Sequence, residues 1–444
     1  MLGVSNMNSE LLFSMALGLQ HPWRLQSVEL KAIDDKKELH MTIDFEKGSL
    51  FYDEHGDSYG VYDTREKTWR HLNFFEHRCY LHCKVPRVTN SQGKVMLVSV
   101  PWAREGSGFT MMFESFARLL IESEMPVNKA ARLLGENPHR LWTIFNYWME
   151  RAYVNDQPSQ ITRLGIDETS SKKGHEYITV GVDLKEKKVV HVTEGKGKDA
   201  VKALKTHFKQ KGMSVDKIAH ASIDLSPAYI AGISEHFPKV EIHFDRFHVV
   251  KLLNEAMNKV RQLERKEHAE LKGHKYTFLK NRSQLSENKA QALSDFITLY
   301  PMLGKAYRLK ELFNDLWEME TEEQATQFLV EWYKEVEDSG IESFKPFLKT
   351  IKTHWQGIVN FCETQINNGI LEGINSKIQL AKRRARGFRQ AKNFINMIYL
   401  LCGRRLIFLV THSKPHRAEK VYRQYINYLV SLFGPIPWEL PNKF

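Results

Sequence analysis

The chain has 444 residues, of which 42% are apolar and 26% charged, so it can bury hydrophobic cores and is neither a disordered nor a fibrous chain. Its length favours two to four domains. The formal net charge of +11 favours a polyanionic partner such as DNA or RNA, although a basic protein need not have one.

Cysteine usage and hydropathy restrict the class of protein further. The N-terminus has no basic region followed by an apolar core, so we expect no secretory signal. The apolar stretch from Phe394 to Val410 contains Arg404 and Arg405, so it is too charged to span a bilayer. The chain has four cysteines, Cys79, Cys83, Cys362 and Cys402. These are too few for a disulfide scaffold, which suits a reducing cytosol.

Residues 1–100 are predicted to form a small β-rich module. The segment "SVELKAIDDKKELHMTIDFEK" alternates apolar and polar residues, which is typical of half-buried strands. A turn-rich segment and the strand "KVMLVSVPW" follow.

Residues 101–155 are predicted to form a helix-turn-helix. The helix "FTMMFESFARLLIESE" precedes the short helix "PVNKAARLLG" and the helix "NPHRLWTIFNYWMERA", whose N-cap is Asn137. Arg140 and Thr143 would then face a DNA groove, while Leu141, Ile144 and Phe145 would pack inward. An ordinary helical hairpin is the alternative.

Residues 156–250 begin with the linker "DQPSQ" and continue as an α/β core. The predicted order is strand, strand, strand, helix, strand, helix, strand, with the first three strands antiparallel. This is the RNase H-like order, a mixed sheet with helices on both faces. Residues 251–355 are predicted to be an all-helical insertion, residues 356–412 the second part of the core, and residues 413–444 a C-terminal tail.

Two aspartates are placed where this core would bind a ligand. Asp167 lies inside the first strand, where a carboxylate is costly to bury unless it is hydrogen-bonded or holds a metal. Asp224 ends the fourth strand, and the strand ends of an open α/β sheet bind ligands. The first and fourth strands are neighbours in the RNase H-like order, so the two carboxylates should converge. Mg²⁺ prefers oxygen ligands, and a third carboxylate would complete a two-metal site.

Glu372 is the candidate for the third carboxylate, near the start of a predicted helix in "NNGILEGINSKIQ". A run of basic residues that suits a phosphate backbone follows it: Lys377, Lys382, Arg383, Arg384, Arg386, Arg389 and Lys392. The alternative is a solvent-exposed Glu372 paired with Lys377 or Lys382.

The segment "HFDRFHVVKLLN" allows two interpretations. Asp245 and Arg246 could line the active site, with Arg246 on a DNA phosphate. Asp245 could instead cap the following helix while His248 packs in the core; we favour capping for Asp245 and keep Arg246 as a DNA contact.

These motifs resemble the DDE transposases of bacterial insertion sequences, specifically the ISL-three family. The resemblance extends from about Met7 over nearly the whole chain, through "VPWAREGSGFT", "VNKAARLLG", "LGIDETSSKKGHEYITVGVDL", "DLSPAYIAGI", "FDRFHVVKLLN" and "NNGILEGINSKIQLAKRRARGF". It implies an RNase H-like core and a catalytic, metal-binding triad of Asp167, Asp224 and Glu372. It also implies two Mg²⁺ or Mn²⁺ ions, DNA of the element ends and target as substrate, a dimer or higher synaptic complex, and a bacterial cytoplasm with nucleoid association.

The N-terminal module departs from the family pattern. Family members carry zinc-binding cysteines after "DFEKG…F" and after "VPRV", and neither segment of this chain contains a cysteine. Cys79 and Cys83 lie in a probable strand without a second pair, so a zinc-ribbon-like module without its ligands is expected, and a structural zinc is not. A catalytically silent DNA-binding regulator is therefore the alternative to an active transposase, and a metal-dependent nuclease is a third hypothesis.

Overall fold

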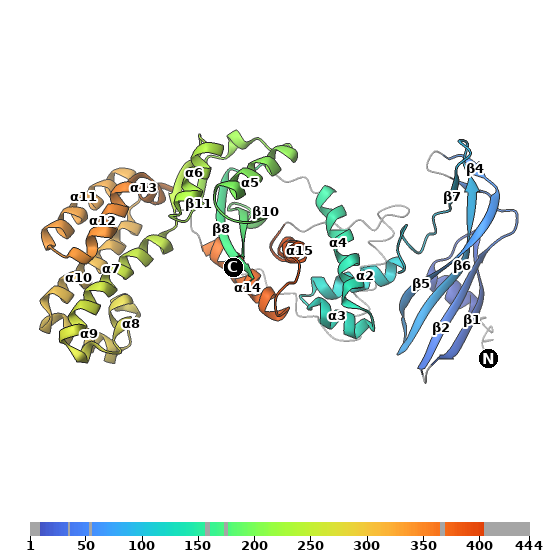
Figure 1. Cartoon of the computed structure of the whole chain (residues 1–444), viewed down its shortest axis with the longest axis horizontal. Helices are drawn as coiled ribbons and strands as arrows, with labels where there is room; N and C mark the ends of the chain where they lie inside the picture. Colours follow the sequence, from blue (N-terminus) through green and yellow to red (C-terminus); the bar gives the residue numbers. More distant parts are fainter. Residues whose placement is uncertain are drawn as a thin grey trace, which may run out of the picture. The chain divides into compact units, whose positions relative to one another are not determined.

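In the computed structural model of the chain, the described residues are 9–33, 36–52, 56–155, 160–172, 176–364 and 369–403 (Figure 1). They form two compact units, one ending at Asn155 and the other beginning with residue 160. Most of the expected linker, the end of the expected second core segment and the whole expected tail of residues 413–444 lie outside the described residues.

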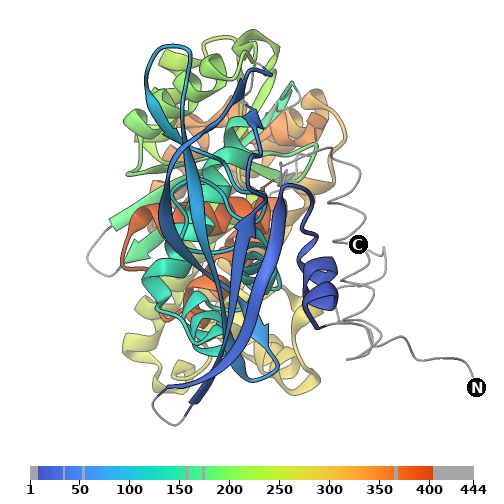
Figure 2. The same cartoon turned by 90° about the vertical axis from the view of Figure 1, so that its right-hand side faces the viewer.

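The N-terminal part of the first unit is built on a five-stranded sheet with the order β1-β2-β6-β5, in which β7 also pairs with β6. Figure 2 shows its long twisted strands (blue). Adjacent strands are antiparallel except β2 and β6, which are parallel. The strand bounds are β1 (Trp23–Ile33), β2 (Lys36–Phe45), β5 (Val61–Phe74), β6 (His77–Thr89) and β7 (Val95–Leu97), with a separate pair β3 (Phe51–Tyr52) and β4 (Ser58–Tyr59).

An apolar core holds this module together. Trp23, Trp69 and Trp102 meet edge to face in it, and the helix α1 (Ser9–Leu17) packs Phe13 and Leu17 against the same core. Only strands were predicted for residues 1–100, so α1 corrects that prediction. Cys79 and Cys83 on β6 also lie in the core, where burial raises the pKa of each thiol to about 12 and so disfavours the thiolate that zinc requires.

Three helices complete the first unit: α2 (Met111–Glu122), α3 (Val127–Leu134) and α4 (Pro138–Asn155). The helix α3 ends at Gly135, whose left-handed conformation (φ 65°) favours glycine. The predicted N-cap is confirmed, because Asn137 Oδ1 accepts a hydrogen bond of 2.8 Å from the backbone N–H of His139. The predicted inward-facing residues Leu141, Ile144 and Phe145 are buried.

The second unit contains a five-stranded mixed sheet with the order β10-β9-β8-β11-β12. Its strands follow the predicted positions: β8 (Arg163–Lys172), β9 (Glu176–Asp183), β10 (Lys188–Glu194), β11 (His220–Ile223) and β12 (Glu241–Phe244). The strands β10, β9 and β8 are antiparallel, whereas β8, β11 and β12 are parallel. The predicted adjacency of the first and fourth strands is therefore confirmed.

Helices cover both faces of this sheet. The helix α5 approaches β9 at Gly181, where an added Cβ would lie 2.8 Å from Leu204. The helix α14 approaches β8 at Gly165, where a Cβ would lie 3.0 Å from Leu371. Gly181 pairs with Ile166, which alternates with Gly165 on β8, so the two helices lie on opposite faces. The helices of this α/β part are α5 (Lys198–Gln210), α6 (Pro227–His236), α14 (Gly369–Arg384) and α15 (Ala391–Cys402).

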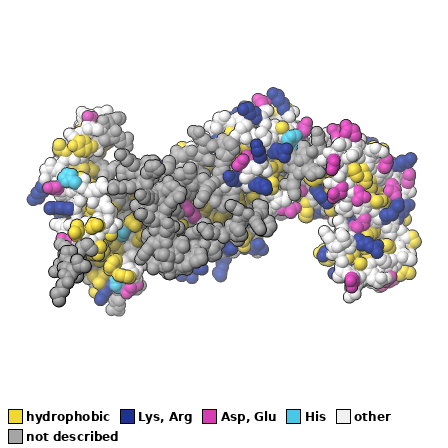
Figure 3. Space-filling view, turned by 180° about the vertical axis from the view of Figure 1, so that it is seen from behind, with side chains coloured by type: hydrophobic (Ala, Val, Ile, Leu, Met, Phe, Trp, Pro, Cys, Tyr) yellow, Lys and Arg dark blue, Asp and Glu magenta, His cyan; other side chains and the backbone are white. Residues whose placement is uncertain are grey.

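A helical region lies between β12 and α14 in the sequence and shares a continuous apolar core with the sheet. Acidic and basic side chains are interspersed over it in Figure 3, on the right of that view. None of the described helices is long and apolar enough to cross a membrane. The region consists of α7 (Arg246–Glu267), α8 (Lys275–Leu279), α9 (Glu287–Leu299), α10 (Pro301–Leu312), α11 (Glu322–Ser339), α12 (Lys345–Thr353) and α13 (Trp355–Thr364).

Candidate active site and DNA-binding elements

Three aspartates share one edge of the mixed sheet. In the parallel registers, Ser222 on β11 pairs with Gly165 on β8 and with His243 on β12. Asp167, Asp224 and Asp245 lie two residues beyond these three paired positions, and the charges of Asp224 and Asp245 both act on Asp167. The backbone N–H of Asp245 also donates a hydrogen bond of 3.1 Å to Ile223 O, which ties the two strand ends together. The middle of β8 and the carboxyl ends of β11 and β12 therefore bring three carboxylates close together.

The carboxyl group of Asp167 has a raised pKa. Its pKa is raised from 3.8 to about 6, chiefly because burial removes water from the carboxylate. The nearby charges of Asp224 and Asp245 raise this pKa further, whereas His248 and a hydrogen bond of 2.7 Å from the Glu168 N–H lower it. Asp167 and Asp224 are thus close enough to repel one another, as the sequence analysis expected.

Helix α14 follows β8 closely and holds Asp167. Asn375 Nδ2 donates a hydrogen bond of 2.6 Å to Asp167 Oδ2, and Gln379 Nε2 donates to Thr169 Oγ1. From Asn375 to Gln379 the helix rises about 6 Å, and from Asp167 to Thr169 the strand rises about 6.6 Å. The matching spacings allow both hydrogen bonds to form at once. Lys382 Nζ makes the last of these contacts, 2.7 Å from Ser170 O.

Glu372 lies one helical turn before Asn375, in the first turn of α14. It is exposed, as the alternative interpretation stated, but none of the ion pairs among the described residues joins it to Lys377 or Lys382, and Lys382 contacts β8 instead. Glu372 lines a cavity of about 550 Å³ together with Asp245 and Arg246. The structure therefore brings Asp167 and Asp224 together and places Glu372 on the helix that holds Asp167, with its carboxylate open to solvent.

The segment after β12 resolves the two interpretations of its polar residues. Asp245 caps α7, because its Oδ1 accepts a hydrogen bond of 2.8 Å from the Phe247 N–H. His248 is not in the core: its side chain is 33% exposed and its Nε2 lies 3.8 Å from Asp245 Oδ2, so that part of the prediction is wrong. It is the nearby His243 that is buried.

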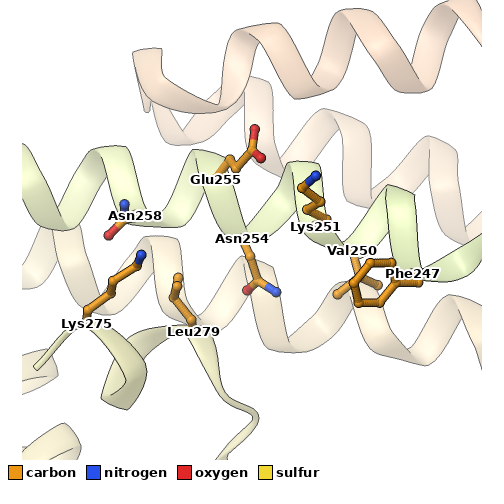
Figure 4. A pocket seen from close by; sticks show the side chains of 8 residues that line it. All are labelled: Phe247, Val250, Lys251, Asn254, Glu255, Asn258, Lys275 and Leu279. Atoms are coloured by element: carbon orange, nitrogen blue, oxygen red, sulfur yellow. The ribbon is translucent and has the colours of Figure 1, made fainter. Parts of the chain in front are cut away.

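Arg246 is the first residue of α7 and lines the same cavity. It is exposed, and its guanidinium lies 5.4 Å from the ring centroid of Trp317. A second hollow of about 300 Å³ follows α7 and is lined by Lys251, Asn254 and Lys275 among others (Figure 4).

The predicted basic residues of this unit differ in exposure. Lys377 is exposed on α14, and Lys382 is partly buried by its contact with β8. The other predicted DNA contacts are exposed at or just beyond the end of α14: Arg383, Arg384, Arg386 and Arg389.

The two predicted contacts on α4 differ in their surroundings. Thr143 is exposed, and its hydroxyl donates a hydrogen bond of 3.0 Å to His139 O. Arg140 is half exposed, pairs with Glu136 at 2.7 Å and lies 4.1 Å from the ring centroid of Phe109. A DNA contact by Arg140 must therefore compete with these partners.

A buried carboxylate joins α2 to α4 and to the preceding loop. Glu114 on α2 is fully buried and accepts hydrogen bonds from Trp148 Nε1 at 2.7 Å and Ser107 Oγ at 2.6 Å. Arg104 Nε completes the set at 2.9 Å. Two donors come from the loop before α2 and one from α4, so Glu114 ties α2 to both of these segments.

Sequence reasoning missed Asn375 and Gln379 as partners of β8. Their signal is the spacing of Glu372, Asn375, Gln379 and Lys382 on one face of a helix, beside the buried Leu371 of the same helix.

Known families match both the three-helix segment and the α/β unit. Residues 98–149 match the helix-turn-helix domain of transposase family ISL3, and residues 164–398 match the DDE transposase domain of the same family. These elements define a DNA-binding transposase. The chain belongs to transposase family ISL3.

Individual relatives agree with this assignment. The chain is 29% identical over 344 residues to the transposase for insertion sequence element IS1001 of Bordetella parapertussis. The matched region covers 75% of this chain and 84% of that protein. It is 27% identical over 385 residues to the transposase for insertion sequence element IS1557 of Mycobacterium tuberculosis, which covers 80% of this chain and 85% of that protein.

Proposed function

We propose that this transposase cleaves and joins DNA at the ends of an insertion sequence by a DDE mechanism, with Asp167, Asp224 and Glu372 as its catalytic, metal-binding acids. The observation that carries the proposal is the parallel pairing of β8 with β11, which runs to Gly165 and Ser222, two residues before Asp167 and Asp224, together with the effect of the Asp224 charge on the pKa of Asp167. The raised pKa of Asp167 supports it, because crowded, poorly solvated carboxylates are a favourable site for a divalent cation. The relatives named as insertion sequence transposases support the substrate class.

The proposed fold of the second unit is an RNase H-like core interrupted by a helical insertion. Three antiparallel strands followed by two parallel ones support this interpretation, as does the order of strands and helices along the chain. The helical region of α7–α13 would be the insertion, since it separates β12 from the helix that carries Glu372.

In this proposal the acids and their neighbours have distinct tasks. Two bound Mg²⁺ or Mn²⁺ ions would activate the attacking oxygen and stabilise the leaving oxygen. Asp167 and Asp224 would provide ligands from the sheet and Glu372 from α14. The Asn375 amide and the Glu168 N–H each hold one oxygen of Asp167, so they orient this carboxylate. Water would displace the 3′-oxygen from phosphorus at the element end, and the freed 3′-hydroxyl would then attack a target phosphodiester in line.

We further propose that double-stranded DNA is bound by both units. Arg140 and Thr143 on α4 would contact the element ends, while Arg246 and the basic residues of α14 and the loop beyond it would contact phosphates near the site. A dimer or higher synaptic complex would bring two ends together, and binding to chromosomal DNA would associate the protein with the nucleoid.

The test is a cleavage assay with the labelled terminal repeat of the element, in Mg²⁺ or Mn²⁺ and in EDTA. We expect metal-dependent nicking at the repeat boundary and strand-transfer products, all abolished in Asp167→Asn, Asp224→Asn and Glu372→Gln without loss of DNA binding. The matched control is Glu168→Gln, since Glu168 alternates with Asp167 and points to the other face of the sheet.

The outcomes separate the alternatives. Specific binding without cleavage by the wild-type chain would make it a DNA-binding regulator. Cleavage without joining would make it a nuclease. Full cleavage by Glu372→Gln together with loss in Asp245→Asn would transfer the third position from α14 to the end of β12.

A further inference from the structure

A cluster of two histidines and a glutamate lies at the amino-terminal ends of β11 and β12, at the end of these strands opposite Asp224 and Asp245. His220 pairs with Glu241 in the parallel register, and Ser222 pairs with His243. Side chains alternate along a strand, so His220, Glu241 and His243 all project from the same face of the sheet. Within the described part of the chain, this is the one group of His, Cys, Asp or Glu side chains found with metal-binding spacing.

The distances between these side chains suit a tetrahedral ion. His220 Nδ1 lies 3.0 Å from His243 Nε2 and 3.3 Å from Glu241 Oε2, and the three ligand atoms lie within 4.8 Å of one another. A tetrahedral zinc ion with bonds of about 2.0–2.1 Å has ligands roughly 3.3 Å apart. The three atoms could therefore close on one ion with small changes in side-chain torsion.

The surroundings suit a bound ion as well. His243 is 1% exposed, and the backbone of Asn360 on α13 forms a hydrogen bond with its ring. Such a bond to a backbone group is the usual means of orienting a metal-binding histidine. The side chains of His220 and Glu241 are 24% and 61% exposed, so an ion can enter from solvent and retain a water ligand. Arg163, paired with His220 in the register, is a nearby cation that opposes binding.

We propose that His220, Glu241 and His243 bind a divalent transition-metal ion of the zinc class, with water as the fourth ligand, and that this ion links β11 to β12. Two imidazoles and one carboxylate select zinc over magnesium, which prefers oxygen ligands and keeps its waters. The site is therefore chemically distinct from the aspartate edge. Because both strands have only four residues, the ion would fix the strands that lead directly into Asp224 and Asp245.

The test is a titration of the full chain, stripped with EDTA and returned to buffer with millimolar Mg²⁺, which is added to compete for the carboxylates of the proposed DDE site. Zn²⁺ binding is followed by calorimetry, and Co²⁺ is followed by its visible absorption, which reports tetrahedral coordination. We expect Zn²⁺ and Co²⁺ to bind at one site in the presence of Mg²⁺. The bound ion should raise the unfolding temperature of the second unit.

Substitutions at the exposed ligands assign the site. His220→Gln and Glu241→Gln should each lower Zn²⁺ affinity at least about 10-fold. Loss of a residue that only hydrogen-bonds to a metal ligand already lowers metal affinity about 10–100-fold, and loss of the ligand itself should cost at least as much. His268→Gln is the matched control. His268 faces Glu264 with its Nε2 and Glu270 with its Nδ1, so the three side chains do not direct their ligand atoms at one ion. Zn²⁺ affinity unchanged in both ligand variants, or absent from the wild-type chain in Mg²⁺, would overturn the proposal. DNA cleavage in Mg²⁺ alone is measured separately, so failure of the zinc site leaves the DDE proposal standing.

Discussion

Asp167 shows how a single residue can oppose folding at the place where it would bind a cation. Its carboxyl is buried beside two other acids, and two hydrogen bonds only partly replace the lost water. Asn375 is one of these donors, and its amide can turn over to accept from a neutral partner at position 167. The residue is therefore accommodated in either charge state, although at different free energy.

The first prediction concerns the stability of the metal-free protein against pH. The folded pKa of Asp167 is raised to about 6, so the stability linked to its protonated form is present below about pH 4 and is lost as the pH rises through 6. Asp167→Asn should therefore raise the free energy of unfolding of the second unit by about 1–3 kcal/mol at pH 8, and change it little near pH 4.

Thermal denaturation in EDTA at both pH values measures this difference. Glu372→Gln is the matched control, because Glu372 is exposed and should change stability little at either pH. A destabilised Asp167→Asn variant at pH 8 would contradict the assignment of the raised pKa to Asp167.

At the scale of elements, two helices are held against the sheet at close range. The helix α14 docks on β8 through Gly165 and through side-chain hydrogen bonds. The helix α13 docks on β12 at Gly357, where an added Cβ would lie 2.4 Å from the Phe244 ring and 3.2 Å from Ile242 O. A ring and a backbone carbonyl cannot yield as a flexible side chain can, so glycine is required for this close approach.

The second prediction follows from this contact. Gly357→Ala should destabilise the second unit by about 1–3 kcal/mol, because overpacking must move α13 away from β12. Gly373→Ala is the matched control in another helix, where nothing lies within 4 Å of the added Cβ. Better helix propensity should make that variant neutral or more stable by up to about 1 kcal/mol. Urea denaturation measures both, and equal effects would show that packing against Phe244 is not the cause.

At the scale of the whole molecule, the charges that make up the net charge of +11 are unevenly distributed along the chain. The helical region carries acids and bases in mixture, including the ion pair of Lys345 with Glu342 on either side of the start of α12. The segment from Lys377 to Lys392 carries basic residues without an acid among them. A polyanion should therefore meet its strongest attraction at the end of α14.

The third prediction is a steep salt dependence of DNA binding. With about 6–10 phosphate contacts, affinity should fall roughly 10³–10⁵-fold between 50 and 200 mM salt. Replacing Arg383, Arg386 or Arg389 by Gln should each reduce the slope of log affinity against log salt by about 1. The matched control is Lys345→Gln, which also removes one positive charge. Lys345 is paired with Glu342 outside the basic segment, so this substitution should leave the slope unchanged. Fluorescence anisotropy at several salt concentrations measures this, and a slope unchanged by the arginine substitutions would exclude this segment as a DNA contact.

Several features of the fold and the site could be predicted because their signals are local. Alternating and helical hydrophobic periods located every strand and α-helix between residues 163 and 244, and Asn137 was recognised as an N-cap from its own neighbours. The parallel pairing of β2 with β6 was not predicted, because pairing between distant strands leaves no local pattern. The helix α1 was not predicted either. His248 was placed in the core because periodicity cannot tell a buried face from one that borders a cluster of acids.

The sequence by itself determined the family, the order of elements and the acids at Asp167, Asp224 and Glu372 as candidates, since these depend on residue identity and short-range pattern. Only the tertiary structure decided which side chains meet. It joined Asn375 to Asp167 across more than two hundred residues, held Lys382 on β8, and aligned His220, Glu241 and His243 in one cluster. The physical reason is that strand register and helix docking are set by packing over the whole sheet, which no segment specifies alone.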